Sequence, residues 1–118
     1  MSDTELQQES APRLLFVDDE PNILSSLRRL FRARGYQVFV ANSGSEGLAL
    51  LEQESVDLVI SDMRMPEMTG FDLLKKVKSS TPQTPVVLLT AYGTIQNAVD
   101  AMKQGAFDYL LKPFSSES

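Results

Sequence analysis

The sequence contains no cysteine and no histidine. Without cysteine the chain can form no disulfide, no thiolate metal site and no cysteine nucleophile. Without histidine it lacks the most common zinc ligand and the most common general base, and it cannot carry a phosphohistidine or a Ser-His-Asp triad. These absences leave carboxylates, hydroxyls and amines as the side-chain groups that can carry chemistry.

Long apolar stretches are also absent, and none approaches the roughly 20 residues that a membrane-spanning helix needs. The N-terminal stretch MSDTELQQESAP is polar and acidic, with no apolar secretory region. We therefore expect a cytoplasmic protein that does not enter a membrane. The net charge of −5 argues against direct nucleic-acid binding by this domain. The expected first helix carries a basic cluster, which consists of Arg28, Arg29, Arg32 and Arg34. Such a cluster is more often a solvated helix face than a nucleic-acid site.

Short apolar runs alternate with segments of helical periodicity along the 118 residues, a length that suits one small domain. We expect strands at 14–17, 37–41, 57–61, 85–89 and 107–111, and helices at 21–34, 45–53, about 71–77 and about 95–102. Such alternation favours a parallel sheet, and runs such as LLFV and VVLL suit strands that are covered on both faces. The predicted fold is a flavodoxin-like, doubly wound α/β sheet with five parallel strands in the order 2-1-3-4-5.

The two ends of the chain give separate expectations. Residues 1–12 are expected to form a flexible N-terminal tail, and residues 13–118 the domain itself. A doubly wound unit of this kind needs a fifth helix, yet the chain stops shortly after Phe114. We therefore expect the last helix to be missing, the domain to be truncated after its fifth strand, and the uncovered apolar surface to favour self-association.

Polar residues stand at the ends of the expected strands. Asp18 and Asp19 follow the first strand, Asp62 follows the third, Thr90 ends the fourth and Lys112 ends the fifth. In an open parallel sheet, ligands bind at the carboxyl ends of the strands, so these side chains are expected to meet in one pocket. Carboxylates, a hydroxyl and an ammonium group together suit a divalent cation and a phosphoryl group. Asp62 would then act as a carboxylate nucleophile that forms an acyl phosphate.

Each of these residues also has a plain structural interpretation. An Asp-Asp-Glu run is often part of a solvated loop, and an Asp at a strand end is often an ordinary loop acid. A lone Thr is often a helix cap, and a lone Lys is usually a surface cation. The Lys112-Pro113 pair adds a candidate cis peptide bond, although cis is the minority state of X-Pro bonds. When no cation is bound, repulsion between the neighbouring carboxylates is expected to raise the pKa of at least one of them.

The motifs FVDDE, SDMRMPEMTG, LLTAYG and DYLLKPF occur in this order. As an ordered set they resemble the receiver (phosphoacceptor) domain of bacterial two-component response regulators, over residues 13–114. The resemblance implies a phosphorylation-controlled signalling switch in which Asp62 accepts a phosphoryl group from a sensor histidine kinase or a phosphotransfer protein. It also implies that a longer chain carries an output domain, whose activity the receiver controls through a changed interaction surface.

The resemblance further implies a role for each residue of the pocket. The protein ligands implied for Mg²⁺, with Mn²⁺ as a substitute, are Asp18, Asp19, Asp62 and the backbone carbonyl of Arg64. The groups implied to bind the phosphoryl oxygens are Thr90, the backbone N–H of Ala91 and Lys112. Tyr109 matches an aromatic switch position, which is expected to turn inward when Thr90 moves toward the phosphate.

Other functions on the same fold are open to this sequence. The leading interpretation is a switch and not a turnover enzyme, with at most self-phosphorylation from small donors and autodephosphorylation. An aspartyl-phosphate phosphatase would need a second acid shortly after its nucleophile, and Arg64 stands where that acid would be. A protein-interaction module that is never phosphorylated would not need the intact set of acids and Lys112. Flavin binding would rest on the fold alone, since no phosphate-cradling loop is present.

Overall fold

Five parallel strands form one sheet in the computed structural model, which describes residues 11–91 and 93–112. The strands are β1 (Arg13–Val17), β2 (Gln37–Ala41), β3 (Leu58–Asp62), β4 (Val86–Thr90) and β5 (Asp108–Leu111). Their order in the sheet is β2-β1-β3-β4-β5, and every pairing is parallel. The predicted fold class and strand order are therefore confirmed.

Four helices connect these strands within the described residues, namely α2 (Pro21–Ala33), α3 (Gly44–Gln53), α4 (Gly70–Ser80) and α5 (Ile95–Lys103). Residues 113–118, where a fifth helix would begin, lie outside the described part of the chain, as do residues 1–10 of the predicted tail. None of the described helices is both long and apolar enough to cross a lipid bilayer.

The helices begin and end at residues that suit their termini. The hydroxyls of Ser43, Thr69 and Thr94 accept a hydrogen bond from the third residue of α3, α4 and α5, which satisfies an otherwise unpaired backbone N–H. Gly35 and Gly105, which follow α2 and α5, have φ angles of 93° and 101°. A side chain would disfavour these left-handed conformations, so glycine ends the helices there at low cost.

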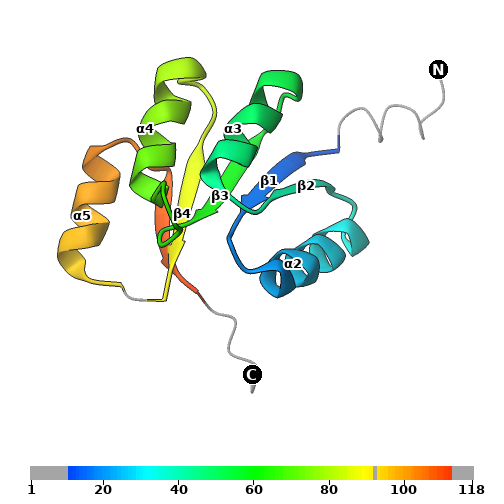
Figure 1. The fold of residues 1–118 in the computed structure, drawn as a ribbon, viewed down its shortest axis with the longest axis horizontal. Coiled ribbons are helices and arrows are strands. Elements are labelled where there is room, and N and C mark those ends of the chain that lie inside the picture. Colours follow the sequence, from blue (N-terminus) through cyan, green and yellow to red (C-terminus); the bar gives the residue numbers. More distant parts are fainter. Residues whose placement is uncertain (1–10, 92, 113–118) are drawn as a thin grey trace.

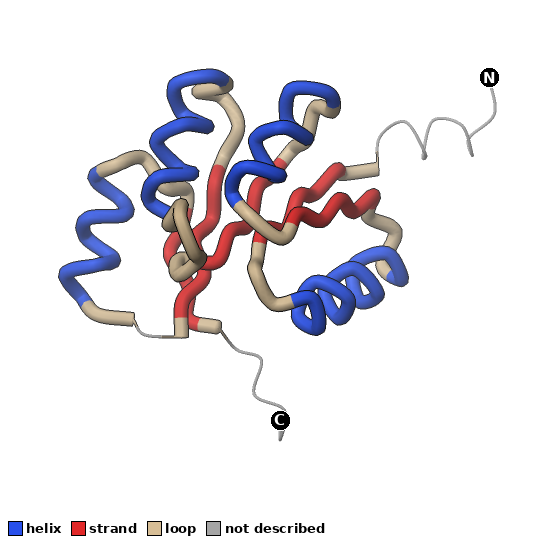
Figure 2. The backbone as a smooth tube through the Cα atoms, viewed as in Figure 1, coloured by secondary structure: helices blue, strands red, loops and turns tan. Residues whose placement is uncertain are grey.

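Helices cover both faces of the sheet, but unequally (Figure 1). Figure 2 shows the strands running through the middle, with α3, α4 and α5 on one face and α2 on the other. The side chains of β1 alternate accordingly: Leu14 and Phe16 pack with Leu24 of α2, whereas Leu15 and Val17 join the core beneath the other helices. Both layers cover β1, whereas Leu58 and Ile60 of β3 remain partly exposed on the face that α2 covers.

The large apolar residues of helix α5 do not form its buried face. Ile95, Val99 and Met102 recur at helical spacing, yet all three are exposed, and Ile95 retains 86% of its accessible surface. The residue that α5 buries is Ala101. The periodicity located the helix correctly, but it did not identify the face that packs against the sheet.

Strands β3 and β4 each end one residue later than predicted, and this difference matters for the site. Asp62 is the last residue of β3 and pairs with Leu89, while Thr90 is the last residue of β4 and pairs with Leu111. Both residues therefore lie within the hydrogen-bonded ladder and not in the loops after it. The sheet itself fixes the positions of their backbones.

Candidate functional site

Two carboxylates and one ammonium group meet at the carboxyl end of the sheet. Asp18 directly follows β1, Asp62 ends β3 and Lys112 directly follows β5. The Nζ atom of Lys112 lies 3.2 Å from Oδ2 of Asp18 and 3.2 Å from Oδ1 of Asp62. Lys112 therefore reaches across the position of β4 and bridges the two carboxylates.

Backbone hydrogen bonds hold these residues in place. The N–H of Asp18 donates to the carbonyl of Ala41 at 3.1 Å, and the N–H of Lys112 donates to the carbonyl of Thr90 at 2.7 Å. The N–H of Glu20 donates to Oδ1 of Asp18 at 2.9 Å and so orients this carboxylate toward the pocket. Backbone hydrogen bonds to neighbouring strands thus fix the positions of Lys112 and Asp18.

Burial decides the electrostatics of the pocket. Asp18 and Asp62 retain only 3% and 5% of their accessible surface. Loss of water raises the pKa of both carboxyls above the usual value, and the charge of Asp18 raises the pKa of Asp62 further, although Lys112 opposes both shifts. Burial lowers the pKa of Lys112, but the attraction of the two carboxylates outweighs burial and raises it. The sequence predicted a raised pKa from repulsion between acids; desolvation is in fact the larger cause.

Asp19 completes a set of carboxylates that is able to hold a metal ion. One oxygen of each of Asp18, Asp19 and Asp62 lies within 4.8 Å of the others, with Asp19 exposed and the other two buried. Hard cations such as Mg²⁺ and Mn²⁺ prefer carboxylate oxygens and retain several waters, which the exposed side of the cluster admits. The donor set and the raised pKa of two of its members fit a divalent cation, because its charge would relieve the repulsion between them.

The loop after β3 is held tightly against the sheet. The N–H of Met63 donates to the carbonyl of Leu89 at 2.8 Å, and the N–H of Gly70 donates to the carbonyl of Met63 at 2.9 Å. Thr69 and Asp72 then form a reciprocal capping box at the start of α4. The hydrogen bonds from Thr69 hold the pKa of Asp72 below its usual value. The backbone around Asp62 is thereby fixed on both sides.

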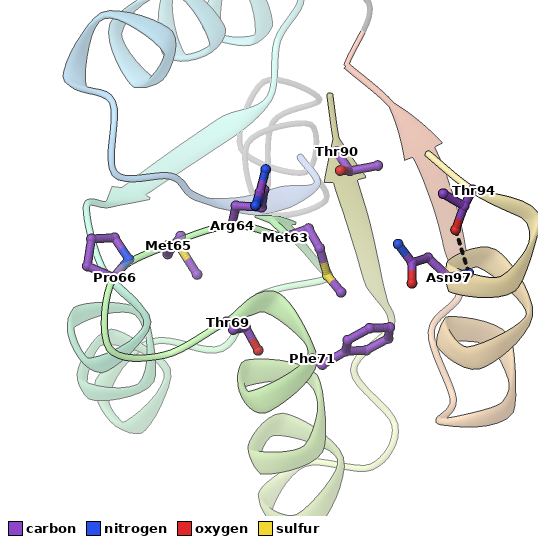
Figure 3. A pocket seen from close by; sticks show the side chains of 9 residues that line it. All are labelled: Met63, Arg64, Met65, Pro66, Thr69, Phe71, Thr90, Thr94 and Asn97. Carbon is purple, nitrogen blue, oxygen red and sulfur yellow. Dashed lines mark hydrogen bonds between the residues drawn. The ribbon is translucent and has the colours of Figure 1, made fainter. Parts of the chain in front are cut away.

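A groove of about 740 Å³ opens beside the carboxylates. Figure 3 shows that the loop after β3 borders it on one side and the start of α5 on the other, with Met63 and Phe71 between them. Arg64 and Thr90 also line it, so the groove adjoins the end of β4. The other polar residues in its lining are Thr69, Thr94 and Asn97, and the remaining lining residues are apolar.

The remaining predicted residues lie around this centre. Thr90 is buried, and Ala91 is exposed directly after it. Tyr109 packs against the core on the sheet face that carries Leu88, and its hydroxyl is buried with no hydrogen-bond partner among the described residues. The metal-ligand role of the Arg64 carbonyl stays a prediction. Pro113 lies outside the described residues, so the predicted cis bond stays a prediction as well.

One residue near the site was not singled out from the sequence. Oε1 of Glu20 lies 3.7 Å from Nζ of Lys112, so a third, mostly exposed carboxylate faces the same ammonium group. Glu20 directly follows the two aspartates, so its position in the acidic run was a signal for its presence at the pocket. Its approach to Lys112 depends on the turn into α2, which no residue pattern specifies.

Comparison with known proteins gives a consistent result. The response regulator receiver domain family matches residues 14–118. The chain is 47% identical over 105 residues to the transcriptional regulatory protein GlrR of Escherichia coli K12, covering 89% of this chain and 24% of that protein. It is 44% identical to the regulatory protein AtoC of the same organism, covering 86% of this chain and 22% of that protein. The chain thus spans about a quarter of the length of these curated relatives.

Solved structures agree in fold as well as in sequence. A response regulator receiver domain protein from Clostridium thermocellum is 41% identical with a TM-score of 0.82, and the match covers 90% of this chain and 86% of that one. The chemotaxis protein CheY4 of Vibrio cholerae is 33% identical with a TM-score of 0.84, and the match covers 92% of each chain. Both similarities extend over at least 90% of this chain.

Proposed function

Because this chain belongs to the response regulator receiver domain family, we propose that Asp62 is the residue that accepts its phosphoryl group. The chain is a signalling domain, a switch controlled by phosphorylation. One observation favours Asp62 above the other acids: it is the carboxylate that ends the central strand β3, beside both Lys112 and the other carboxylates. An incoming phosphoryl group would meet positive charge on one side and a fixed nucleophile on the other.

The proposed reaction needs positioning more than acid–base chemistry. A carboxylate oxygen of Asp62 attacks the phosphorus of the donor and forms a new O–P bond. The bond from phosphorus to the donor nitrogen or oxygen breaks, and its electron pair leaves with the donor. Asp62 reacts in its ionised form, so no general base is required, and the absence of histidine is no obstacle. Lys112 keeps its charge near the transferring oxygens and favours the ionised form of Asp62.

Asp18, Asp19, Asp62 and the backbone carbonyl of Arg64 are the proposed protein ligands of Mg²⁺, for which Mn²⁺ can substitute. When bound, the cation neutralises charge on the phosphoryl oxygens and on the carboxylates. The protein contributes the geometry, because Asp18 and Asp62 are buried and oriented by the strands, while the exposed Asp19 leaves room for water.

Thr90, Ala91 and Tyr109 are proposed to act after the transfer. The hydroxyl of Thr90 and the N–H of Ala91 would bind phosphoryl oxygens, and the movement of Thr90 would change the space available to Tyr109. The buried, unpartnered hydroxyl of Tyr109 supports this role. Burying a hydroxyl without a partner costs free energy, so a position in which it reached a partner would be favoured.

The proposed partners follow from the family. A sensor histidine kinase or a phosphotransfer protein would supply the phosphoryl group in the cytoplasm, and an output domain in a longer chain would read the changed surface. The domain itself would catalyse only self-phosphorylation from small donors and autodephosphorylation. Self-association through the uncovered sheet surface where a fifth helix would pack is a further part of this proposal.

Intact-protein mass after incubation with a small phosphodonor and Mg²⁺ tests the assignment of Asp62. We expect the parent chain to gain the mass of one phosphoryl group, and Asp62→Asn to gain none. Asp100→Asn removes a carboxylate from α5, away from the pocket, and is expected to behave like the parent. Omission of the metal should abolish the gain. A gain that persists in Asp62→Asn would show that another residue is the acceptor.

A further inference from the structure

A groove of about 430 Å³ runs between helix α2 and the first residues of the edge strand β2, whereas the carboxylates lie at the carboxyl ends of β1 and β3. Arg28 and Arg32 line it from the helix, and Gln37, Val38 and Phe39 line it from the strand. Among residues 11–91 and 93–112 the strand β2 pairs only with β1, so its outer side is one of the two edges of the described sheet. The groove therefore combines positive charge with an unpaired strand.

The charge beside this groove is concentrated and unbalanced. Helix α2 carries no acidic residue, and basic residues crowd its last turns and the position after it, namely Arg28, Arg29, Arg32 and Arg34. All four are exposed, and within residues 11–91 and 93–112 none of them forms an ion pair. They make up four of the chain's 11 basic residues in a protein of net charge −5. The patch is thus positive where the rest of the domain is on balance negative.

The backbone of β2 offers unpaired hydrogen-bonding groups on the same side. The N–H of Gln37 donates toward β1, to Pro12, and the carbonyl of Ala41 accepts from Asp18 after β1. Because backbone groups alternate in direction along a strand, the N–H and C=O groups of Val38 and Val40 point away from β1. Free edges are commonly guarded by charge or proline, but the strand sequence QVFVA contains neither.

The spacing of the two features matches. Arg28 and Arg32 are one turn apart, which separates them by about 6 Å along the helix. Alternate residues of an extended strand lie about 6.6 Å apart and face the same side of the sheet. Val38 and Val40 pair with Leu14 and Phe16, so they lie on the sheet face that α2 covers. Alternate side chains of a strand added beside β2 would therefore face the two arginines.

We propose that this groove binds an extended acidic segment of a partner protein, which adds to the sheet beside β2 and places acids at alternate positions against Arg28 and Arg32. The backbone of the segment pairs with Val38 and Val40, and its carboxylates form charge-assisted hydrogen bonds with the guanidinium groups. A second copy of the chain does not fit, because pairing two β2 edges would bring two arginine patches together. A DNA duplex would satisfy the arginines but not the backbone groups of the strand.

The test uses the isotope-labelled 118-residue chain and a short synthetic peptide of alternating glutamate and valine, followed by NMR at physiological salt. We expect saturable shifts centred on the amides of Val38 and Val40. Arg28→Gln/Arg32→Gln should weaken binding about tenfold. Lys75→Gln/Lys76→Gln removes the same charge from the exposed side of α4 and should leave binding unchanged. Val38→Pro, which removes an outward N–H that an edge strand can spare, should also weaken binding.

Each alternative outcome overturns the proposal. Equal loss in the two double variants would show non-specific attraction of the peptide to positive charge. Equal binding of a peptide with the same residues but its glutamates grouped at one end would show that the alternate spacing is irrelevant. Tighter binding of a short DNA duplex to the same residues would assign the patch to nucleic acid. If the peptide caused no NMR shifts in the folded parent chain, the arginines would serve only to prevent unwanted strand pairing at the β2 edge.

Discussion

At the scale of single residues, the pocket carries more negative than positive charge. Lys112 lies at hydrogen-bonding distance from both Asp18 and Asp62, so one positive charge serves two buried carboxylates. Glu20 adds a third carboxylate at 3.7 Å from the same ammonium group. Burial raises the pKa of Asp18 and Asp62 even though both have a cationic partner, and neighbouring carboxylates add to both shifts. The metal-free domain therefore holds unfavourable electrostatic energy that a divalent cation would remove.

Asp62→Asn is expected to stabilise the metal-free protein at neutral pH. The folded-state pKa of Asp62 lies above its ordinary value, so the folded chain binds this proton more tightly than the unfolded chain does. The ionised carboxylate thus opposes folding at neutral pH; this penalty shrinks as the pH falls below the folded-state pKa and is gone below the ordinary pKa of Asp. The asparagine leaves Lys112 paired with Asp18 and Glu20, and Tm should rise by about 4 °C, the shift that about 1 kcal/mol produces in a domain of this size.

Thermal unfolding in the presence of a chelator measures this difference. It should shrink as the pH falls through the acid range between the ordinary pKa of Asp and the raised one, because the parent then becomes protonated at Asp62. Saturating Mg²⁺ should reverse the order, since only the parent keeps its full set of carboxylates. A variant that is less stable than the parent at neutral pH without metal would contradict the electrostatic account.

The sequence predicted the members of the pocket better than their energetics. Asp18, Asp62 and Lys112 were identifiable because parallel strands bring their carboxyl ends to one edge of the sheet. The dominance of desolvation over repulsion could not be predicted, because it depends on how much water the loops after β1 and β3 exclude. The contact of Glu20 with Lys112 depends likewise on the turn into α2, whose geometry only the folded chain defines.

At the scale of elements, the start of α4 sets the position of the β3 terminus. A Cβ atom at Gly70 would lie 2.8 Å from the carbonyl oxygen of Asp62 and 2.9 Å from Cα of Met63. Both neighbours are backbone atoms, which cannot rotate away. Gly44 occupies the same first position in α3, but its nearest neighbour would be the flexible end of the Met68 side chain. The two glycines therefore differ in what an added methyl group would displace.

Gly70→Ala is expected to destabilise the domain by about 2 kcal/mol, within the range for overpacking, and to slow phosphoryl uptake because the backbone of Asp62 must shift. Gly44→Ala serves as the matched control and should cost less, with little change in uptake. Denaturant unfolding and the rate of mass gain with a small phosphodonor measure the two effects. Equal effects of the two substitutions would mean that the close packing of α4 on β3 does not control the site.

Element positions followed from the sequence because short apolar runs, caps and glycines each have a local cause. The strand 37–41 was predicted at its observed bounds, and the others within one residue. The packing of α5 was not predictable in the same way. Its apolar stripe at Ile95, Val99 and Met102 is exposed, because periodicity reports that a helix has an apolar face and not what covers that face.

At the scale of the whole molecule, the two faces and two edges of the sheet differ in character. The β2 edge adjoins the arginines of α2, whereas the β5 edge is apolar. The large side chains of Phe107, Leu110 and Leu111 are all exposed there, and the stripe on α5 adds further apolar surface. Surfaces of this kind usually mark a contact with another protein or an aggregation site. The partner of this surface would be a second copy or another part of a longer chain.

The β5 edge is expected to cause reversible self-association of this 118-residue chain. Sedimentation velocity should show an average mass that rises with protein concentration, because the exposed leucines and Phe107 lose contact with water when two copies meet. Leu110→Glu places a charge in this surface and should give a monomer at concentrations where the parent associates. Leu30→Glu is a close control, because Leu30 is 45% exposed on α2 and Leu110 is 44% exposed on β5. The Leu30 variant should associate like the parent. A strictly monomeric parent would remove the basis for self-association, and equal loss in both variants would mean that general charge repulsion, and not the β5 surface, controls it.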